Sequence, residues 1–231
     1  FIADETLPEE ERRYQAGTHY EKIVDSVQDI DGAVAFLKEQ GYAELYLMGH
    51  SSGANKICVY DAEAKNNPFK KYVLAGPGDD SGLFYNELGE KKFWLALRYA
   101  RQSIKHNRAE QIMPKYTGMY PFSAQAAADI LNPDGNYNTF PLYEATTKRL
   151  GKKPLFKEYA HIKKPMLVIY GENDEYTYTG GGTKPALNIF REFSHPDTLK
   201  HSDFKIVPST DHGFHGRETG FAKMVADWLS R

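Results

Sequence analysis

A serine between two glycines is the residue of this chain best suited to covalent chemistry. In LYLMGHSSGANK, residues 45–56, an apolar run stops at Gly49, and Ser51 and Gly53 follow before a helix-like segment. The spacing Gly-x-Ser-x-Gly between a strand and a helix is typical of the nucleophile elbow, a sharp turn that exposes the serine hydroxyl. We expect both glycines to be required, because a side chain at either position would collide with the neighbouring strand or helix. Taken alone, the pattern also fits an ordinary serine in a turn.

A catalytic serine needs a base and a group that orients the base, because its hydroxyl is a weak nucleophile near neutral pH. The run VIYGENDEY ends the third expected strand and contains Asp174, our preferred acid, with Glu172 and Glu175 as alternatives. The run VPSTDHGFHG offers His212, which directly follows the expected strand end, and His215 as the alternative base. Each of these residues alone reads as a loop residue. Together they follow the serine in the order nucleophile, acid, histidine that an elbow of this kind predicts.

Short apolar runs and amphipathic segments alternate along the chain and predict the elements that hold these residues. Four runs that stop at glycine, aspartate or serine indicate buried parallel strands: AELYLMG, KKYVLAGPG, KPMLVIYGEND and SDFKIVPSTDHG. Helical segments are expected at 54–65, 185–193 and 221–229. An earlier helix, opened by a capping box at residues 18–21, carries one apolar face: Ile23, Val27, Ile30, Val34 and Leu37. This alternation predicts an α/β fold, a mainly parallel sheet with helices on both faces.

A long insert separates the second and third expected strands. We therefore predict a core made of residues 1–77 and 165–231 and a lid or cap of residues 78–164, with helices near 91–105 and 123–131. The aromatic residues of the insert could line a substrate pocket, although packing is the commoner role: Phe84, Tyr85, Phe93, Trp94, Tyr99, Tyr116, Tyr120, Phe122, Tyr137, Phe140 and Tyr143.

Charge and composition exclude several classes of partner. The chain has 231 residues, and its 29 basic and 31 acidic side chains leave a net charge of −2, which argues against a nucleic-acid surface. No apolar run approaches the roughly 20 residues of a membrane span. The single cysteine, Cys58, rules out an internal disulfide framework and suits a reducing compartment such as the cytoplasm. A small-molecule substrate is the partner we expect, and the sequence does not indicate an oligomeric state.

Two aspartates that follow the second strand fit two functional roles, but the sequence supports these roles less well than it supports the triad. Asp79 and Asp80 stand where a triad acid could also be placed, so they are the alternatives to an acid on the third strand. With Asp211, His212 and His215 they also suggest a metal site. We disfavour that reading because scattered acids and histidines are common in turns, and we expect no metal or cofactor.

The chain resembles the α/β-hydrolases from YEKIVDSVQDIDGAVAFLKEQGY through the elbow to STDHGF. Its elbow is similar to a branch with the motif GHS-[ST]-GANK, described mostly as hydrolases or as domains of unknown function. The resemblance implies a Ser51–His212–Asp174 triad that cleaves a carboxylic ester through an acyl-enzyme. It also implies that the backbone N–H of Ser52 is the first oxyanion donor. His50 is expected to pack rather than react.

The chain departs from the family pattern before the elbow. In α/β-hydrolases an upstream strand and loop supply the second oxyanion donor, but here only a polar stretch, one helix and one strand come first. We expect that roughly 50–80 residues and the second donor lie upstream of residue 1, estimated from typical strand and helix lengths. Loss of one oxyanion donor lowers rates about 100- to 1,000-fold. The alternative function is therefore a catalytically silent protein of this fold that binds a small ligand under its lid.

Overall fold

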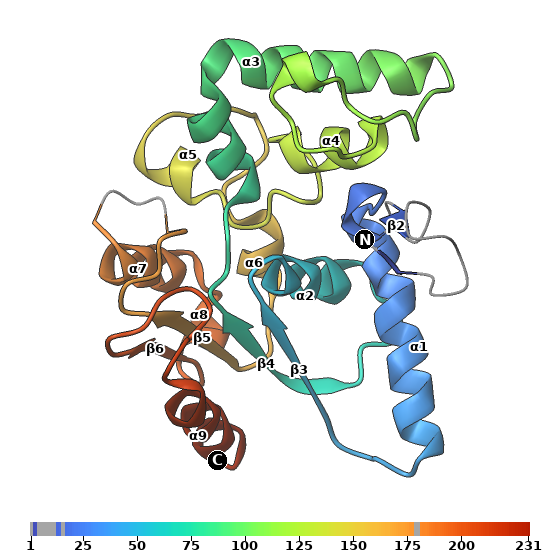
Figure 1. The fold of residues 1–231 in the computed structure, drawn as a ribbon. Coiled ribbons are helices and arrows are strands. Elements are labelled where there is room, and N and C mark those ends of the chain that lie inside the picture. Colours follow the sequence, from blue (N-terminus) through green and yellow to red (C-terminus); the bar gives the residue numbers. More distant parts are fainter. Residues whose placement is uncertain (1, 4–12, 15–16, 178–180) are drawn as a thin grey trace.

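Four parallel strands form the sheet on which the chain is built (Figure 1). The computed structural model describes residues 2–3, 13–14, 17–177 and 181–231. The strands pair in the order in which they occur: β3 (Leu45–His50), β4 (Phe69–Ala75), β5 (Met166–Gly171) and β6 (Asp203–Val207). Two short strands, β1 (Ile2–Ala3) and β2 (Arg13–Tyr14), pair antiparallel with each other in a separate sheet. All four strands expected from the apolar runs are confirmed.

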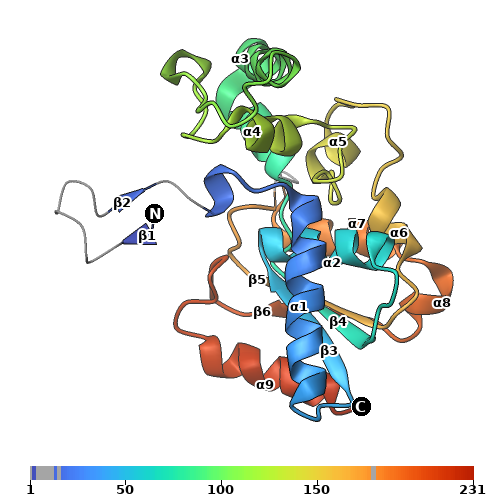
Figure 2. The same ribbon diagram turned by 90° about the vertical axis from the view of Figure 1, so that its right-hand side faces the viewer.

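Helices cover both faces of the sheet, as the alternation of elements predicts. In β4, Tyr72 and Leu74 pack on one face and Val73 and Ala75 on the other, and all four are buried. Three helices lie on the first face: α1 (Ser26–Glu39), α2 (Ser52–Glu63) and α7 (Thr183–Phe193). The second face is covered by α9 (Glu218–Leu229), which lies across the sheet from α2 (Figure 2). The fold is therefore the expected α/β-hydrolase-like sheet.

The first helix begins later than its capping box predicts. Two short 3-10 helices, η1 (Gly17–His19) and η2 (Ile23–Asp25), precede α1, which begins at Ser26. The residues expected to cap the helix therefore lie outside it, and this detail of the sequence analysis is wrong. The apolar face itself is confirmed, since Val34 is buried against the sheet and Ile23 is fully buried just before the helix.

Strand β3 forms one edge of the sheet and is only partly covered. Leu45 packs under α1 and α2, but on the other face Tyr46 and Met48 are 37% and 47% exposed. Within the described residues no strand pairs with the free side of β3. The unpaired edge expected from the sequence is present, and an upstream segment that covers it stays a prediction.

The insert between β4 and β5 divides into two parts. The first is built on α3 (Asp80–Lys105) and α4 (Ala124–Leu131), which surround an apolar cluster of their own above the sheet (Figure 1). Helix α3 begins well before the predicted residue 91 because it continues through a kink at Gly89, where φ is 71°. A lid function and its boundaries at residues 78 and 164 stay predictions.

The second part of the insert returns to the sheet. Phe140, Leu142, Phe156 and Tyr159 are fully buried in the core under α2 and α7. The remaining short helices of the described chain are η3 (Lys115–Thr117), α5 (Leu142–Thr146), α6 (Lys157–His161) and α8 (Pro196–Leu199). None of the helices in the described ranges has both the length and the apolar character that a membrane span requires.

Candidate active site

Ser51 sits in a strained turn between β3 and α2. Its φ of 56° and ψ of −128° fall where residues with a side chain are rarely found, and such backbone strain clusters at functional sites. The backbone N–H of Ser51 donates to the carbonyl of Ala75 at 2.9 Å, and the Ser51 carbonyl accepts from Ala54 N–H at 2.9 Å. These bonds hold the turn between the end of β4 and the first turn of α2. The geometry is that of a nucleophile elbow.

The two glycines that flank Ser51 differ in their packing. A Cβ placed on Gly49 would lie 2.2 Å from the carbonyl oxygen of Gly53 and 2.7 Å from the nitrogen of Ala54. A Cβ placed on Gly53 would meet nothing within 4 Å apart from the backbone of its own helix. The expectation that both positions exclude a side chain is thus wrong for Gly53. Only Gly49 is required by the close approach of strand and helix.

This difference gives a stability prediction. Gly49→Ala should destabilise the fold by about 3 kcal/mol or leave it unfolded, because backbone atoms rather than flexible side chains oppose the new methyl group. Gly53→Ala, the matched control, should change the free energy of unfolding by less than about 1 kcal/mol, since alanine fits a helix. Thermal and denaturant unfolding of both variants checks this. Similar losses at the two positions would contradict the assigned packing.

Asp174, which is buried, and His212, which is partly buried, form a pair at the ends of neighbouring strands. Asp174 follows β5, His212 follows β6, and His212 Nδ1 donates to Asp174 Oδ2 at 2.9 Å. The Asp174 side chain is fully buried, and its second oxygen accepts the backbone N–H of Tyr176 at 2.9 Å. With Nδ1 engaged, the free nitrogen of the neutral imidazole is Nε2, which can accept a proton.

The alternative acids and base are placed elsewhere. Glu172 accepts the backbone N–H of Ser209 at 2.8 Å, and Glu175 accepts the backbone N–H of His212 at 3.2 Å, so neither orients the imidazole of His212. His215 pairs with Asp211 at 2.8 Å, and its side chain is 79% exposed. Of the candidate acids and bases, Asp174 and His212 are therefore the two whose side chains the structure brings into contact.

His212 is contacted by His50 and by two residues that the sequence did not point to, Tyr176 and Gly76. Its ring lies between those of His50, at 4.7 Å, and Tyr176, at 4.8 Å. His50 Nε2 also bonds the backbone carbonyl of His212 at 2.8 Å, which agrees with the packing role expected for it. A Cβ on Gly76, where φ is 52°, would lie only 3.0 Å from the imidazole of His212. Asn55 of α2 donates to the carbonyl of Gly78 at 3.1 Å and thereby ties the elbow helix to the loop after β4.

Ser51 and His212 line one cavity of about 250 Å³. The other lining residues are Gly78, Asp79, Asp80, Leu83 and Tyr176. Among the described residues no hydrogen bond joins the Ser51 hydroxyl to His212, so the shared cavity is the observation that places them together. Catalytic hydrogen bonds are often long before substrate binds. None of the insert aromatics proposed as pocket residues lines this cavity, and Tyr176, which does, lies outside the insert.

Asp79 has a structural role instead of the alternative acid role considered for it. Its carboxylate accepts the backbone N–H of Gly82 and that of Tyr143, both at 2.7 Å, so it caps α3 and fixes the start of α5. Burial raises its pKa to about 7, although these two hydrogen bonds act in the opposite direction. Within the described parts of the chain no three His, Cys, Asp or Glu side chains are grouped as metal ligands.

The electrostatics around His212 favour its protonated form. Burial alone would lower the pKa of His212, but the hydrogen bond that it donates to Asp174 and the negative charges of Asp174, Glu175 and Asp80 outweigh this effect. The pKa is therefore raised above the ordinary value of an imidazole. This arrangement stabilises the imidazolium that forms when a histidine takes a proton from a serine.

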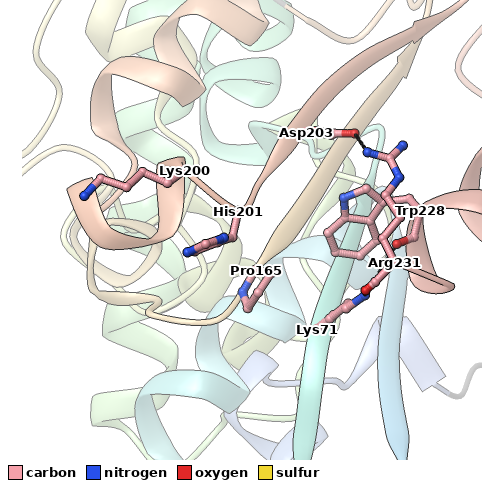
Figure 3. Close-up of a pocket in the computed structure, with 7 residues that line it drawn as sticks. All are labelled: Lys71, Pro165, Lys200, His201, Asp203, Trp228 and Arg231. Atoms are coloured by element: carbon pink, nitrogen blue, oxygen red, sulfur yellow. Dashed lines mark hydrogen bonds and ion pairs between the residues drawn. The ribbon is translucent and has the colours of Figure 1, made fainter.

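A second cavity, of about 320 Å³, lies at the opposite end of the strands (Figure 3). Lys71 reaches the carbonyl oxygen of Leu229 at 2.9 Å and those of Trp228 and Arg231 at 3.4 and 3.3 Å. Arg231 in turn pairs with Asp203 at 3.1 Å. These contacts cap the carboxyl end of α9 and hold it against the sheet, which gives the basic residues here a structural role.

Solved structures of similar fold include a hydrolase, a lipase and an esterase. The siderophore hydrolase EstB from Aspergillus fumigatus matches with a TM-score of 0.63 and 15% identity over 90% of this chain and 75% of that one. The monoacylglycerol lipase of Paleococcus ferrophilus has a TM-score of 0.53 and 15% identity, over 91% and 76% of the two chains. An esterase from Exiguobacterium antarcticum has a TM-score of 0.51 and 13% identity, over 94% of this chain and 77% of that one. At such identities the likeness establishes the fold.

Sequence comparison identifies the family. No curated protein matches the chain. One family model, described as "Protein of unknown function (DUF1749)", matches residues 20–230, which include the elbow and the strand ends that carry Asp174 and His212. The chain therefore belongs to this family of unknown function and has the α/β-hydrolase fold.

Proposed function

We propose that the protein is a serine hydrolase that cleaves a carboxylic ester. The observation that carries this proposal is the Asp174–His212 pair, at 2.9 Å, whose histidine lines the same cavity as Ser51 on its strained turn. Each residue follows a different parallel strand, so the sheet brings together three groups that are far apart in sequence. A nucleophile, a base and an orienting acid are the parts that acyl transfer requires.

The proposed reaction has two steps. His212 Nε2 takes the proton of Ser51 as its oxygen attacks the ester carbonyl, while Asp174 holds the imidazole and stabilises its charged form. The backbone N–H of Ser52, in the first turn of α2, is the donor we assign to the developing oxyanion, where the positive end of the helix dipole also acts. The alcohol leaves with the proton from His212. Water then attacks the acyl-enzyme, with His212 again as base.

Hydrolysis of a panel of esters tests this function. The panel contains para-nitrophenyl esters of increasing acyl length and one hydroxycinnamate ester, offered to the full-length protein. Turnover by the wild type, together with its loss in the Ser51→Ala variant, is the expected result. Binding of esters without turnover, unaffected by Ser51→Ala, would instead favour a catalytically silent binding protein.

The raised pKa of His212 predicts a pH profile. His212 must be neutral to act as the base, so kcat/KM should rise with pH and its lower midpoint should lie above about 6.5, the ordinary imidazole value. Glu175→Gln removes one of the negative charges that raise this pKa, and should move the midpoint to lower pH. Its matched control is Glu192→Gln on α7, which should not move it. A midpoint below 6.5 in the wild type would contradict the assignment.

A further inference from the structure

Asp80 carries an unpaired carboxylate oxygen beside the proposed reaction centre. The residue lines the same cavity as Ser51 and His212, and its Oδ2 is buried without a hydrogen-bond partner among the described residues. The neighbouring Asp79 differs in this respect, because both of its oxygens accept backbone N–H groups. A buried acceptor left unpaired costs about 1–3 kcal/mol, and more when it is charged. Asp79, not Asp80, caps α3, so helix capping does not explain why the Oδ2 of Asp80 is buried.

The side chains around Asp80 leave its Oδ2 without a hydrogen-bond partner among the described residues. Tyr137 lies close enough to lower the pKa of Asp80, and the side chain of Ser52 acts in the same direction on the pKa of Tyr137. Tyr137 comes from a later part of the insert and Ser52 from the elbow helix, so the surroundings of Asp80 are built from separate segments of the chain. Leu83 and Tyr176 form its less polar wall.

The charge of the cavity selects against anions. Two of the lining residues are aspartates, and none of the lining residues is a lysine or arginine. Burial raises the pKa of Asp80, while Tyr137 and the positive form of His212 act in the opposite direction. Like the positive form of His212, a cation that enters the cavity would stabilise the ionised carboxylate of Asp80. It would thereby offset the free energy that burial of this carboxylate costs.

We propose that Asp80 is the specificity-determining residue of the site and binds a protonated amine carried by the ester substrate. The ammonium N–H donates to the carboxylate of Asp80, and the apolar stem of the amine lies against Leu83 and Tyr176. A charge-assisted hydrogen bond of this kind favours the cationic substrate by about 10- to 100-fold over a neutral one of the same shape. This inference rests on the proposed function, since it assigns the substrate of that same site.

A pair of phosphonate probes tests the inference and the function separately. Both are para-nitrophenyl methylphosphonate esters; one carries a dimethylaminopropyl group, which is protonated at neutral pH, and the other an isohexyl group of the same shape. Ser51 attacks phosphorus, its proton passes to His212, and para-nitrophenolate leaves with the electrons of the broken P–O bond. The measured quantity is the ratio of the two second-order labelling rates.

Variants at residue 80 then test whether Asp80 causes the preference for the cationic probe. The wild type should react about 10- to 100-fold faster with the cationic probe, Asp80→Asn should bring the ratio close to one, and Asp80→Glu should retain most of the preference. Glu87→Gln removes the same charge from an exposed position of α3 and is the matched control, which should keep the wild-type ratio. Because each ratio compares two probes on one protein, a general loss of activity cancels.

The outcomes are distinct. Equal labelling rates in the wild type, or a preference that Asp80→Asn leaves unchanged, would overturn the role of Asp80 while Ser51 remained the nucleophile. If neither probe labels Ser51, the proposed function itself is wrong. If Asp80→Asn does not fold, the wild-type ratio and the Asp80→Glu ratio still decide, since a neutral site gives a ratio near one in both.

Discussion

Ser51→Ala is expected to lower kcat for ester hydrolysis by about a million-fold, the loss seen when a triad serine is removed from a hydrolase. The substitution removes the only atom that can form the acyl-enzyme, whereas the strained turn around it is held by backbone hydrogen bonds that alanine keeps. Stability should therefore change little. Steady-state kinetics of the purified variant, beside the wild type, measure the loss.

The control for this variant is Ser230→Ala. Ser230 is exposed and follows α9, far along the chain from the strand ends that carry the site, so its loss should leave kcat unchanged. A Ser51→Ala protein with more than about one thousandth of the wild-type kcat would show that another group is the nucleophile. Unfolding curves of both variants separate lost chemistry from lost structure.

Asp174→Asn is expected to lower kcat by about ten-thousand-fold with little change in KM, because asparagine keeps the shape but favours the wrong imidazole tautomer. In the structure the Asp174 carboxylate accepts the Nδ1 proton of His212. An asparagine there can present its amide N–H₂ group instead, which places the proton on Nε2 and removes the base.

Glu172→Gln is the matched control for Asp174→Asn. Glu172 belongs to the same GEND turn but contacts the backbone of Ser209 and not His212, so its loss should change kcat less than threefold. If Glu172→Gln or Glu175→Gln abolished activity while Asp174→Asn retained it, the acid would be misassigned. The pH profile of each variant gives an independent check, since the lower midpoint reports His212.

Most of the sheet could be predicted from the sequence because buried parallel strands leave short apolar runs that end abruptly. The runs that contain Leu45, Tyr72, Val168 and Val207 all form strands in the expected order. Local signals failed where packing decides the outcome. The capping box at residues 18–21 does not start α1, and the part of α3 before Gly89, residues 80–88, was missed because Gly89 interrupts its pattern.

The central residues of the site could also be predicted, since parallel strands deliver their carboxyl ends to one edge of a sheet. That rule places Ser51, Asp174 and His212 together without any knowledge of side-chain contacts. It could not distinguish the roles of Asp79 and Asp80, which are adjacent in sequence. Only the structure shows that one caps α3 while the other lines the cavity and has a buried oxygen without a hydrogen-bond partner among the described residues.

The residues that pack around His212 and Ser51 could not be predicted from the sequence, for a different reason. Tyr176 and Gly76 matter through their distances to His212, which depend on how three loops pack. The requirement at Gly49 and its absence at Gly53 likewise follow from the approach of β3 to α2, although the two glycines look equivalent in the motif. A spacing pattern alone contains no information on such contacts.

The central claim, that Ser51 is a nucleophile activated by His212, is tested most directly by labelling the full-length protein with a fluorophosphonate and mapping the modified peptide by mass spectrometry. We predict a single adduct on Ser51, absent from Ser51→Ala and formed far more slowly in His212→Ala. No adduct on the folded wild-type protein, or an adduct on another residue, would contradict the assignment.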